Sequence, residues 1–373
     1  MKICIATDFH LSYKQYGLEE REHDFYRQYE NLIHNVINEK PKILLILGDI
    51  FDTPYPKPIS IKKFEEGLDM LKEQGIKVYG IIGNHTMIQR KNYYPIDKIF
   101  DDKYTLLDED YIITEDIFIG GLKYHPKTHD IKPLIDKLYE ESKGCKLKIL
   151  LLHQILKQDQ PIGYDYDEED LRLDRFDFVF LGHLHKRTTR KCGNSVIHYS
   201  GSINSCNISE MSDEMRNGKG YSVLDTDSMM LTARNLEPVR HYVEYNLKND
   251  GLNDTSIGDV IKSLKGYPIK PVVMLKSFGN NAKYVYAFAK KLEDYSLIIK
   301  QKQMVENHEG SIGKTVEKGS FGHDRIEKML ASEFEDDWKG NLAIGLFRAL
   351  SKGDVEGALK LAEDVYDVEK HTS

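Results

Sequence analysis

Five short polar clusters follow apolar runs in the first 185 residues of the chain. They combine carboxylate, amide and imidazole side chains, and each begins where a strand-like apolar run ends. Because the carboxyl ends of neighbouring parallel strands meet at one edge of a sheet, we expect these side chains to line one crevice. The clusters are Asp8-Phe9-His10, Gly48-Asp49-Ile50-Phe51-Asp52, Gly83-Asn84-His85, His153-Gln154 and Gly182-His183-Leu184-His185.

The donor atoms of these clusters predict a site for two metal ions. Asp8 and His10 are two residues apart at a strand end, which directs both side chains to one face. The carboxylate of Asp49 can bridge two cations, since its two oxygens point to separate positions. The remaining donors are the amide oxygen of Asn84 and the imidazoles of His153, His183 and His185.

The mixture of oxygen and nitrogen donors, without a thiolate, argues against a structural zinc site and favours Mn, Fe or Zn in an open catalytic site. Magnesium alone suits it less, because Mg²⁺ prefers oxygen ligands. Two ions about 3.5–4 Å apart can clamp the attacking and leaving oxygens of a phosphoryl displacement and lower the pKa of a bridging water. His85 adjoins Asn84 without needing to be a ligand, so it is placed to donate to a phosphate oxygen or protonate the leaving oxygen.

Each cluster has an ordinary explanation when it is taken alone. Asp49 and Asn84 stand in turn sequences, and Asp52 could simply hold its loop. His183 and His185 could be solvated or core histidines. All of these clusters follow apolar strands in one chain, so chance is a poor explanation for the set. The clusters together predict a phosphodiesterase site.

The segments that must position the clusters alternate between strand and helix patterns. This alternation predicts an α/β core with its crevice at the carboxyl ends of the strands. Short runs later in the chain indicate antiparallel strands, so we expect mixed sheets in a first domain of residues 1–238. The expected strands are 2–7, 43–47, 77–82, 111–124, 147–152, 176–181, 196–199, 220–224 and 230–236, and the expected helices are 21–40, 60–74 and 131–141.

The remaining third of the chain divides into three segments. Residues 239–303 alternate strand, helix, strand, helix and strand, which predicts a compact α+β module. Residues 304–322 are rich in Gly, Ser and charge and indicate a linker. Residues 323–373 are helical, and helices this short cannot bury their apolar faces alone. They dock either on a partner protein or on the preceding module.

The composition is that of a soluble globular protein. Of the 373 residues, 40% are apolar and 30% are charged. No apolar run reaches the roughly 18 residues of a membrane span, and the N-terminus lacks the features of a signal peptide. Without C-x-x-C spacing, the cysteines are expected to be reduced thiols of a cytoplasmic protein, one bridged pair being the lesser alternative. They are Cys4, Cys145, Cys192 and Cys206.

The net charge of −8 counts against a nucleic-acid partner, because such proteins usually have a basic surface. A basic run nevertheless follows the last polar cluster directly. It could contact phosphates, or it could be a solvated turn. Its members are Lys186, Arg187, Arg190 and Lys191.

The clusters resemble those of the calcineurin-like metallophosphoesterase superfamily, and the finer sequence is similar to the SbcD/Mre (meiotic recombination eleven) DNA-repair nucleases. This resemblance implies an α/β four-layer sandwich with mixed β-sheets, followed by a DNA-binding capping domain. It also implies a helical segment at 323–373 that binds an SMC-like ATPase of the SbcC or Rad type. The motifs that carry it are Asp8-Phe9-His10-Leu11, Gly48-Asp49-Ile50-Phe51-Asp52, Gln89-Arg90 after Gly83-Asn84-His85, Leu152-His153-Gln154, Gly182-His183-Leu184-His185-Lys186 and Tyr199-Ser200-Gly201-Ser202.

The resemblance also implies a homodimer on DNA ends, with Mn²⁺-dependent exonuclease and single-strand endonuclease activity. His85 is then the catalytic residue that is not a ligand. By the same resemblance, one metal ion is held by Asp8, His10, Asp49 and His185, and the other by Asp49, Asn84, His153 and His183.

The chain departs from the family pattern at two positions. Thr86 stands where superfamily members commonly have an acidic residue, and Ser12 stands where this family usually has glycine. Dimer contacts are expected after Pro58 and around Pro95–Phe100, where core packing is an equal alternative for the apolar residues.

Two other functions compete with the DNA nuclease. A phosphoesterase of the same superfamily would act on nucleotides or other small phosphodiesters. A binding subunit would tether DNA ends without cutting them.

Overall fold

The computed structural model describes residues 1–87, 95–247, 254–278, 282–304 and 337–351. The chain forms two compact units, Met1–Glu306 and Asn307–Ser373. In the second unit, α9 (Asp337–Ser351) is a helix within the segment expected to be helical. Gln89-Arg90, the linker beyond residue 304 and the rest of the segment 323–373 lie outside the described residues.

Two six-stranded sheets form the first part of the first unit, in the orders β12-β11-β1-β2-β3-β4 and β5-β6-β7-β8-β10-β9. Each sheet has parallel strands at its centre and antiparallel neighbours, as predicted. The first sheet contains β1 (Lys2–Ala6), β2 (Ile43–Ile46), β3 (Lys77–Gly80), β4 (Thr105–Leu106), β11 (Gly220–Asp225) and β12 (Met230–Asn235). The second contains β5 (Asp110–Thr114), β6 (Ile117–Gly121), β7 (Leu147–His153), β8 (Phe178–Gly182), β9 (Thr188–Cys192) and β10 (Ser195–Tyr199).

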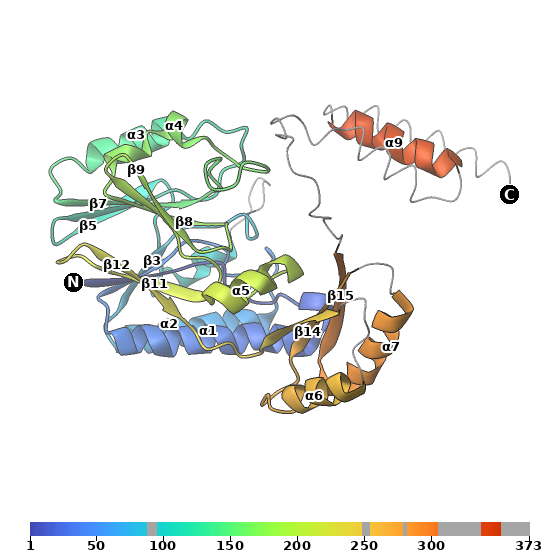
Figure 1. Ribbon diagram of the computed structural model, residues 1–373. Helices are drawn as coiled ribbons and strands as arrows, with labels where there is room; N and C mark the ends of the chain where they lie inside the picture. Colours follow the sequence, from blue (N-terminus) through green and yellow to red (C-terminus); the bar gives the residue numbers. More distant parts are fainter. Residues whose placement is uncertain (88–94, 248–253, 279–281, 305–336, 352–373) are drawn as a thin grey trace. The chain divides into compact units, whose positions relative to one another are not determined.

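Helices cover the outer face of each sheet, which completes a four-layer sandwich (Figure 1). The strand β2 shows why its sequence is apolar throughout. Leu44 and Ile46 pack on the helix side, whereas Ile43 and Leu45 pack between the sheets, because successive side chains of a strand point to opposite faces. The covering helices are α1 (Glu19–Glu39) and α2 (Pro58–Glu73) on the first sheet and α3 (Lys132–Glu141) and α4 (Glu168–Leu171) on the second.

The strand at 196–199, expected to be antiparallel, has one neighbour of each kind. β10 is antiparallel to β9, as expected, but runs parallel to its other neighbour, β8. The reason is β9, which was not anticipated from the sequence. It carries the chain back along the sheet from the end of β8 and pairs antiparallel with β10 at the edge.

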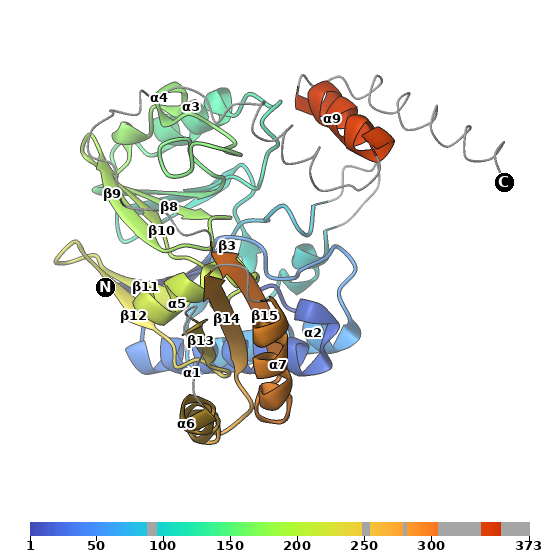
Figure 2. The same cartoon turned by 45° about the vertical axis from the view of Figure 1, so that its right-hand side comes forward.

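A third sheet follows, with β13 (Tyr242–Leu247), β14 (Val272–Phe278) and β15 (Ile298–Met304) all parallel. The helices α6 (Asp254–Leu264) and α7 (Ala282–Leu292) share one core with a face of this sheet (Figure 2). On the other face, Val272 and Met274 pack with Met211 of α5 (Met211–Asn217). The order of elements is therefore the one predicted for residues 239–303.

Two general expectations can be compared with this structure. None of the helices described is long and apolar enough to span a membrane. All four cysteines lie within the described residues, and all four are free thiols.

Candidate metal centre

The polar clusters occupy backbone conformations that side chains rarely adopt. Asp8 (φ 55°), His10 (φ 47°), Asp49 (φ 48°) and His183 (φ 81°) all have positive φ. Such a conformation costs a non-glycine residue on the order of 1–3 kcal/mol, and it persists where the surrounding structure requires it. Ser12 also has positive φ (82°), which explains why glycine suits that position. Four of the predicted metal ligands therefore have strained backbone conformations.

Glycines let the strand ends approach each other closely. At Gly48 (φ 95°), a Cβ atom would lie 2.5 Å from Nδ1 of His153 and 2.8 Å from the Cα of Gly83. A side chain at Gly83 would in turn meet the carboxylate of Asp49. These two glycines therefore permit the ends of β2, β3 and β7 to converge.

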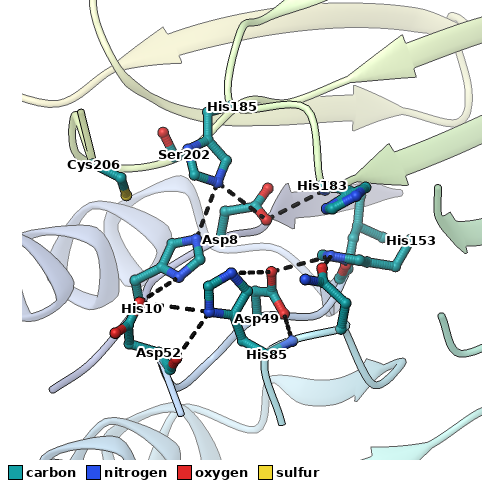
Figure 3. Close-up of polar contacts among 12 residues, drawn as sticks. Asp8, His10, Asp49, Asp52, His85, His153, His183, His185, Ser202 and Cys206 are labelled. Carbon is teal, nitrogen blue, oxygen red and sulfur yellow. Dashed lines mark hydrogen bonds and ion pairs between the residues drawn. The ribbon is translucent and has the colours of Figure 1, made fainter. Parts of the chain in front are cut away.

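One group of donors comes from the ends of β1 and β2. Asp8, His10 and Asp49 each offer a ligand atom within 4.8 Å of the others, and all three side chains are buried. His185 approaches from the second sheet, with its Nε2 3.0 Å from Nε2 of His10 and 3.9 Å from Oδ1 of Asp8 (Figure 3). The structure thus brings together the four residues predicted for one metal position.

A second group lies beside the first and shares one member with it. Asp49, His153 and His183 offer ligand atoms within 4.8 Å of one another. Nε2 of His153 lies 3.2 Å from Oδ2 of Asp49 and 3.0 Å from Oδ1 of Asn84. Nδ1 of His153 lies 2.6 Å from the carbonyl oxygen of Leu47, to which its N–H can donate. All four predicted donors of the second position therefore meet, and Asp49 belongs to both groups.

An unpaired oxygen atom supports a cation at this site. Oδ2 of Asp8 is buried and forms no hydrogen bond within the described part of the chain, whereas Oδ2 of Asp49 faces ring nitrogens of His153 and His85 at 3.2 and 4.0 Å. An ionised carboxylate oxygen buried without a partner is costly, whereas a bound cation compensates it. The donors are carboxylate, amide and imidazole groups, which suit divalent transition-metal ions.

The charges of the site depend on one another. Burial opposes ionisation of Asp49, but His153 and His10 hold the pKa of this carboxyl well below its usual range. Against the effect of burial, Asp49 raises the pKa of His153 to about 9. Burial together with His153 lowers the pKa of His183 to about 4. Without a bound ion, His183 is therefore neutral near pH 7, whereas His153 is protonated.

His85 lies at the edge of the site with its side chain 37% exposed. Its Nδ1 lies 2.8 Å from the backbone carbonyl of Asp52 and can donate to it, which leaves Nε2 facing the centre, 4.0 Å from Oδ2 of Asp49. A carbonyl acceptor thus orients this histidine. The next residue, Thr86, is buried. It stands where superfamily members commonly have an acidic residue.

Sequence reasoning missed two residues of the site. Glu210, at the end of the 3-10 helix η4 (Ile208–Glu210), has Oε1 3.0 Å from Nδ1 of His185. Cys206 offers its sulfur within 4.8 Å of ligand atoms of His10 and His185. A thiol that the sequence analysis did not anticipate therefore lies beside two of the predicted donors. Both residues follow the Tyr199-Ser200-Gly201-Ser202 motif, which was the only available signal.

Comparison with known proteins agrees with this geometry. A family model described as calcineurin-like phosphoesterase matches residues 1–187. The chain is 32% identical over 286 residues to the DNA double-strand break repair protein Mre11 of Methanocaldococcus jannaschii, covering 74% of this chain and 76% of that protein. The chain belongs to the Mre11 family of calcineurin-like phosphoesterases. The Mre11 protein of Methanococcus maripaludis is similar along nearly the whole length, with 26% identity over 377 residues, 96% of this chain and 97% of that protein.

Membership of the Mre11 family makes this chain a metal-dependent phosphodiesterase. The predicted family resemblance and the four-layer fold are confirmed. Divalent metal ions are implied by the family, and the two donor groups described above fit them.

Two of the four residues of the basic run are paired within the protein instead of being free in a solvated turn. Arg190 lies on β9, where Nε and Nη2 donate to Asp159 at 2.7 and 2.8 Å and Nη1 pairs with Glu168 at 2.6 Å. Arg187 donates to the carbonyl oxygen of Ser200 at 3.1 Å. The two other members, Lys186 and Lys191, are exposed. The two arginines therefore have protein partners, and contact with phosphate stays a prediction.

A buried acid near Thr86 leads to a prediction about stability. Asp97, in the 3-10 helix η2 (Ile96–Phe100), is fully buried. Burial raises its pKa to about 7, although the hydroxyl of Thr86 acts in the opposite direction. The native state therefore holds one more proton than the unfolded state between about pH 4 and pH 7, so stability falls as the pH rises through that range.

We expect Asp97→Asn to remove this decrease in stability with rising pH. Relative to the wild type, the variant gains up to about 2.7 kcal/mol between about pH 5 and pH 8, because Asn does not titrate. The measurement is the free energy of unfolding of EDTA-treated protein in urea at both pH values. The exposed Asp116, replaced by Asn, is the control. Parallel pH profiles for Asp97→Asn and wild type would contradict the assignment.

Proposed function

We propose that this protein is a Mn²⁺-dependent two-metal DNA nuclease, an exonuclease on duplex ends and an endonuclease on single strands. The observation that carries the proposal is the position of Asp49, which is shared by two donor groups with His85 beside it. The names of the relatives, DNA double-strand break repair proteins, support DNA as the substrate.

The residues divide into two metal positions and one proton donor. Asp8, His10, Asp49 and His185 would hold the first ion. Asp49, Asn84, His153 and His183 would hold the second. When bound, the two ions supply charge neutralisation for the phosphodiester and activation of the attacking water.

The protein groups then act on the phosphate and on the leaving oxygen. His85, held through Nδ1 by the Asp52 carbonyl, presents Nε2 toward the space between the donor groups. In its protonated form it donates to a phosphate oxygen or to the leaving oxygen. Burial of Asp8, Asp49 and His153 keeps bulk water away from the charges that attract the substrate.

Other parts of the proposal concern partners. Lys186 and Lys191 are exposed and could contact the DNA backbone, and residues 239–303 would form the DNA-binding capping domain. The exposed Ile59 and Ile99 support a homodimer, whereas Phe100 is a core residue. We further propose a cytoplasmic protein whose segment 323–373 binds an SMC-like ATPase in a break-repair complex; α9 within that segment is consistent with this role.

The experiment compares substrates under one set of conditions. The purified chain, stripped with EDTA and then given Mn²⁺, is assayed on labelled blunt and hairpin DNA and on a panel of cyclic nucleotides and nucleotide monophosphates. Each assay is run with and without a co-expressed ATPase. Cleavage of DNA that requires added metal supports the proposal. Hydrolysis of nucleotides alone favours a small-molecule phosphoesterase, and DNA binding without cleavage favours a tethering subunit.

A further inference from the structure

The thiol of Cys206 lies beside His10 and His185, two of the four residues of the first metal position. Figure 3 shows its sulfur facing the pair formed by His10 and His185. One ligand atom from each of the three residues lies within 4.8 Å of the others, and the two histidine Nε2 atoms are 3.0 Å apart. A nitrogen and a sulfur ligand of one tetrahedral zinc ion are separated by roughly 3.6 Å. The three donors are therefore within reach of a single ion.

The loop that carries Cys206 is held in place by several bonds. Its backbone N–H donates to Oε2 of Glu210 at 3.2 Å, and its carbonyl oxygen accepts from the hydroxyl of Tyr13 at 3.0 Å. The preceding carbonyl, of Ser205, accepts from the amide of Gln15 at 3.0 Å. These bonds come from two separate parts of the chain, the segment with Tyr13 and Gln15 and the helix with Glu210, so the position of the thiol is built into the fold.

The same carboxylate that positions the cysteine also aims the histidine. Oε1 of Glu210 lies 3.0 Å from Nδ1 of His185, and Oε2 lies 3.1 Å from the ammonium group of the buried Lys219. Lys219 also donates to the backbone carbonyl of His185 at 2.8 Å. A carboxylate on Nδ1 fixes the ring orientation and makes Nε2 the better ligand. Glu210 thus organises both His185 and Cys206.

We propose that Cys206 is a thiolate ligand of the first metal position and increases the preference of that position for Zn²⁺ over Mn²⁺. Thiolates select zinc, whereas manganese is better matched by carboxylate and water. On binding, the sulfur gives its proton to solvent and forms the bond to the ion. Excess Mn²⁺ still fills the position, but zinc is kept when both ions compete. The inference concerns the ion and is independent of whether DNA is the substrate.

Cobalt spectroscopy tests the ligand directly. We expect full-length wild-type protein loaded with Co²⁺ to show an intense near-ultraviolet sulfur-to-cobalt absorption. Cys206→Ser should lose that absorption and keep the visible cobalt bands, which report that the ion is bound. Cys192→Ser, which changes a thiol on β9, is the matched control and should resemble the wild type. The proposal would be overturned if wild type bound cobalt without showing the sulfur-to-cobalt absorption. It would also be overturned if Cys206→Ser kept that absorption.

Metal competition measures the preference. In equilibrium dialysis against mixed Zn²⁺ and Mn²⁺, the ratio of zinc to manganese bound should fall at least tenfold in Cys206→Ser and stay unchanged in Cys192→Ser. A ratio that stays within twofold in Cys206→Ser would contradict the inference. X-ray absorption of zinc-loaded wild type needs no variant: a sulfur neighbour at about 2.3 Å is expected, and a shell of nitrogen and oxygen alone would refute it. None of these measurements uses DNA, so failure to cleave DNA leaves their result intact.

Discussion

Asp49→Asn is expected to reduce phosphodiester cleavage by about 10³-fold or more and to weaken metal binding at both positions. The carboxylate is buried, and it is the one residue shared by the two donor groups. An amide has one oxygen and no charge, so it cannot hold two cations. It also removes the negative charge that raises the pKa of His153.

Calorimetric titration with Mn²⁺ and a DNA cleavage assay measure the two effects separately. The matched control is Asp116→Asn, which makes the same chemical change at an exposed residue paired with Lys146. Its metal binding and cleavage should equal those of wild type. If Asp49→Asn bound two ions with unchanged affinity, Asp49 would not be the bridging ligand.

The second large effect is expected from His85→Gln, which should lower the cleavage rate by about 10²–10⁴-fold while metal binding stays unchanged. His85 lies beside the donor groups, and its Nδ1 is occupied by the carbonyl oxygen of Asp52. Glutamine can still form a hydrogen bond, but it cannot transfer a proton to the leaving oxygen. Because His85 is 37% exposed, we expect little change in stability.

Single-turnover cleavage, calorimetry with Mn²⁺ and DNA-binding affinity are measured on the same preparation. His34→Gln, on the exposed face of α1, controls for the loss of a histidine. A loss of bound metal in His85→Gln would make His85 a ligand, and unchanged cleavage would remove it from the mechanism. Either result contradicts the division of roles proposed above.

Other groups orient His85 in place of the acidic residue that commonly follows this histidine in the superfamily. The carbonyl of Asp52 orients the imidazole, and the carboxylate of the same residue lies 3.6 Å from Nδ1 of His85. Thr86 is buried near Asp97, so an acid does lie close to this position although it is distant in sequence.

The sequence by itself was sufficient to predict most of the strands, their mixed arrangement and the eight polar residues that converge, from Asp8 to His185. The hydrophobic pattern makes this possible, because buried strands are apolar throughout and parallel strands present their carboxyl ends at one edge of the sheet. Only the tertiary structure showed that Cys206 and Glu210 join the site, that β9 returns along the sheet and that Arg190 is paired with Asp159. These features depend on loop paths and on contacts between residues far apart in the chain, for which neither spacing nor hydrophobic pattern carries a signal.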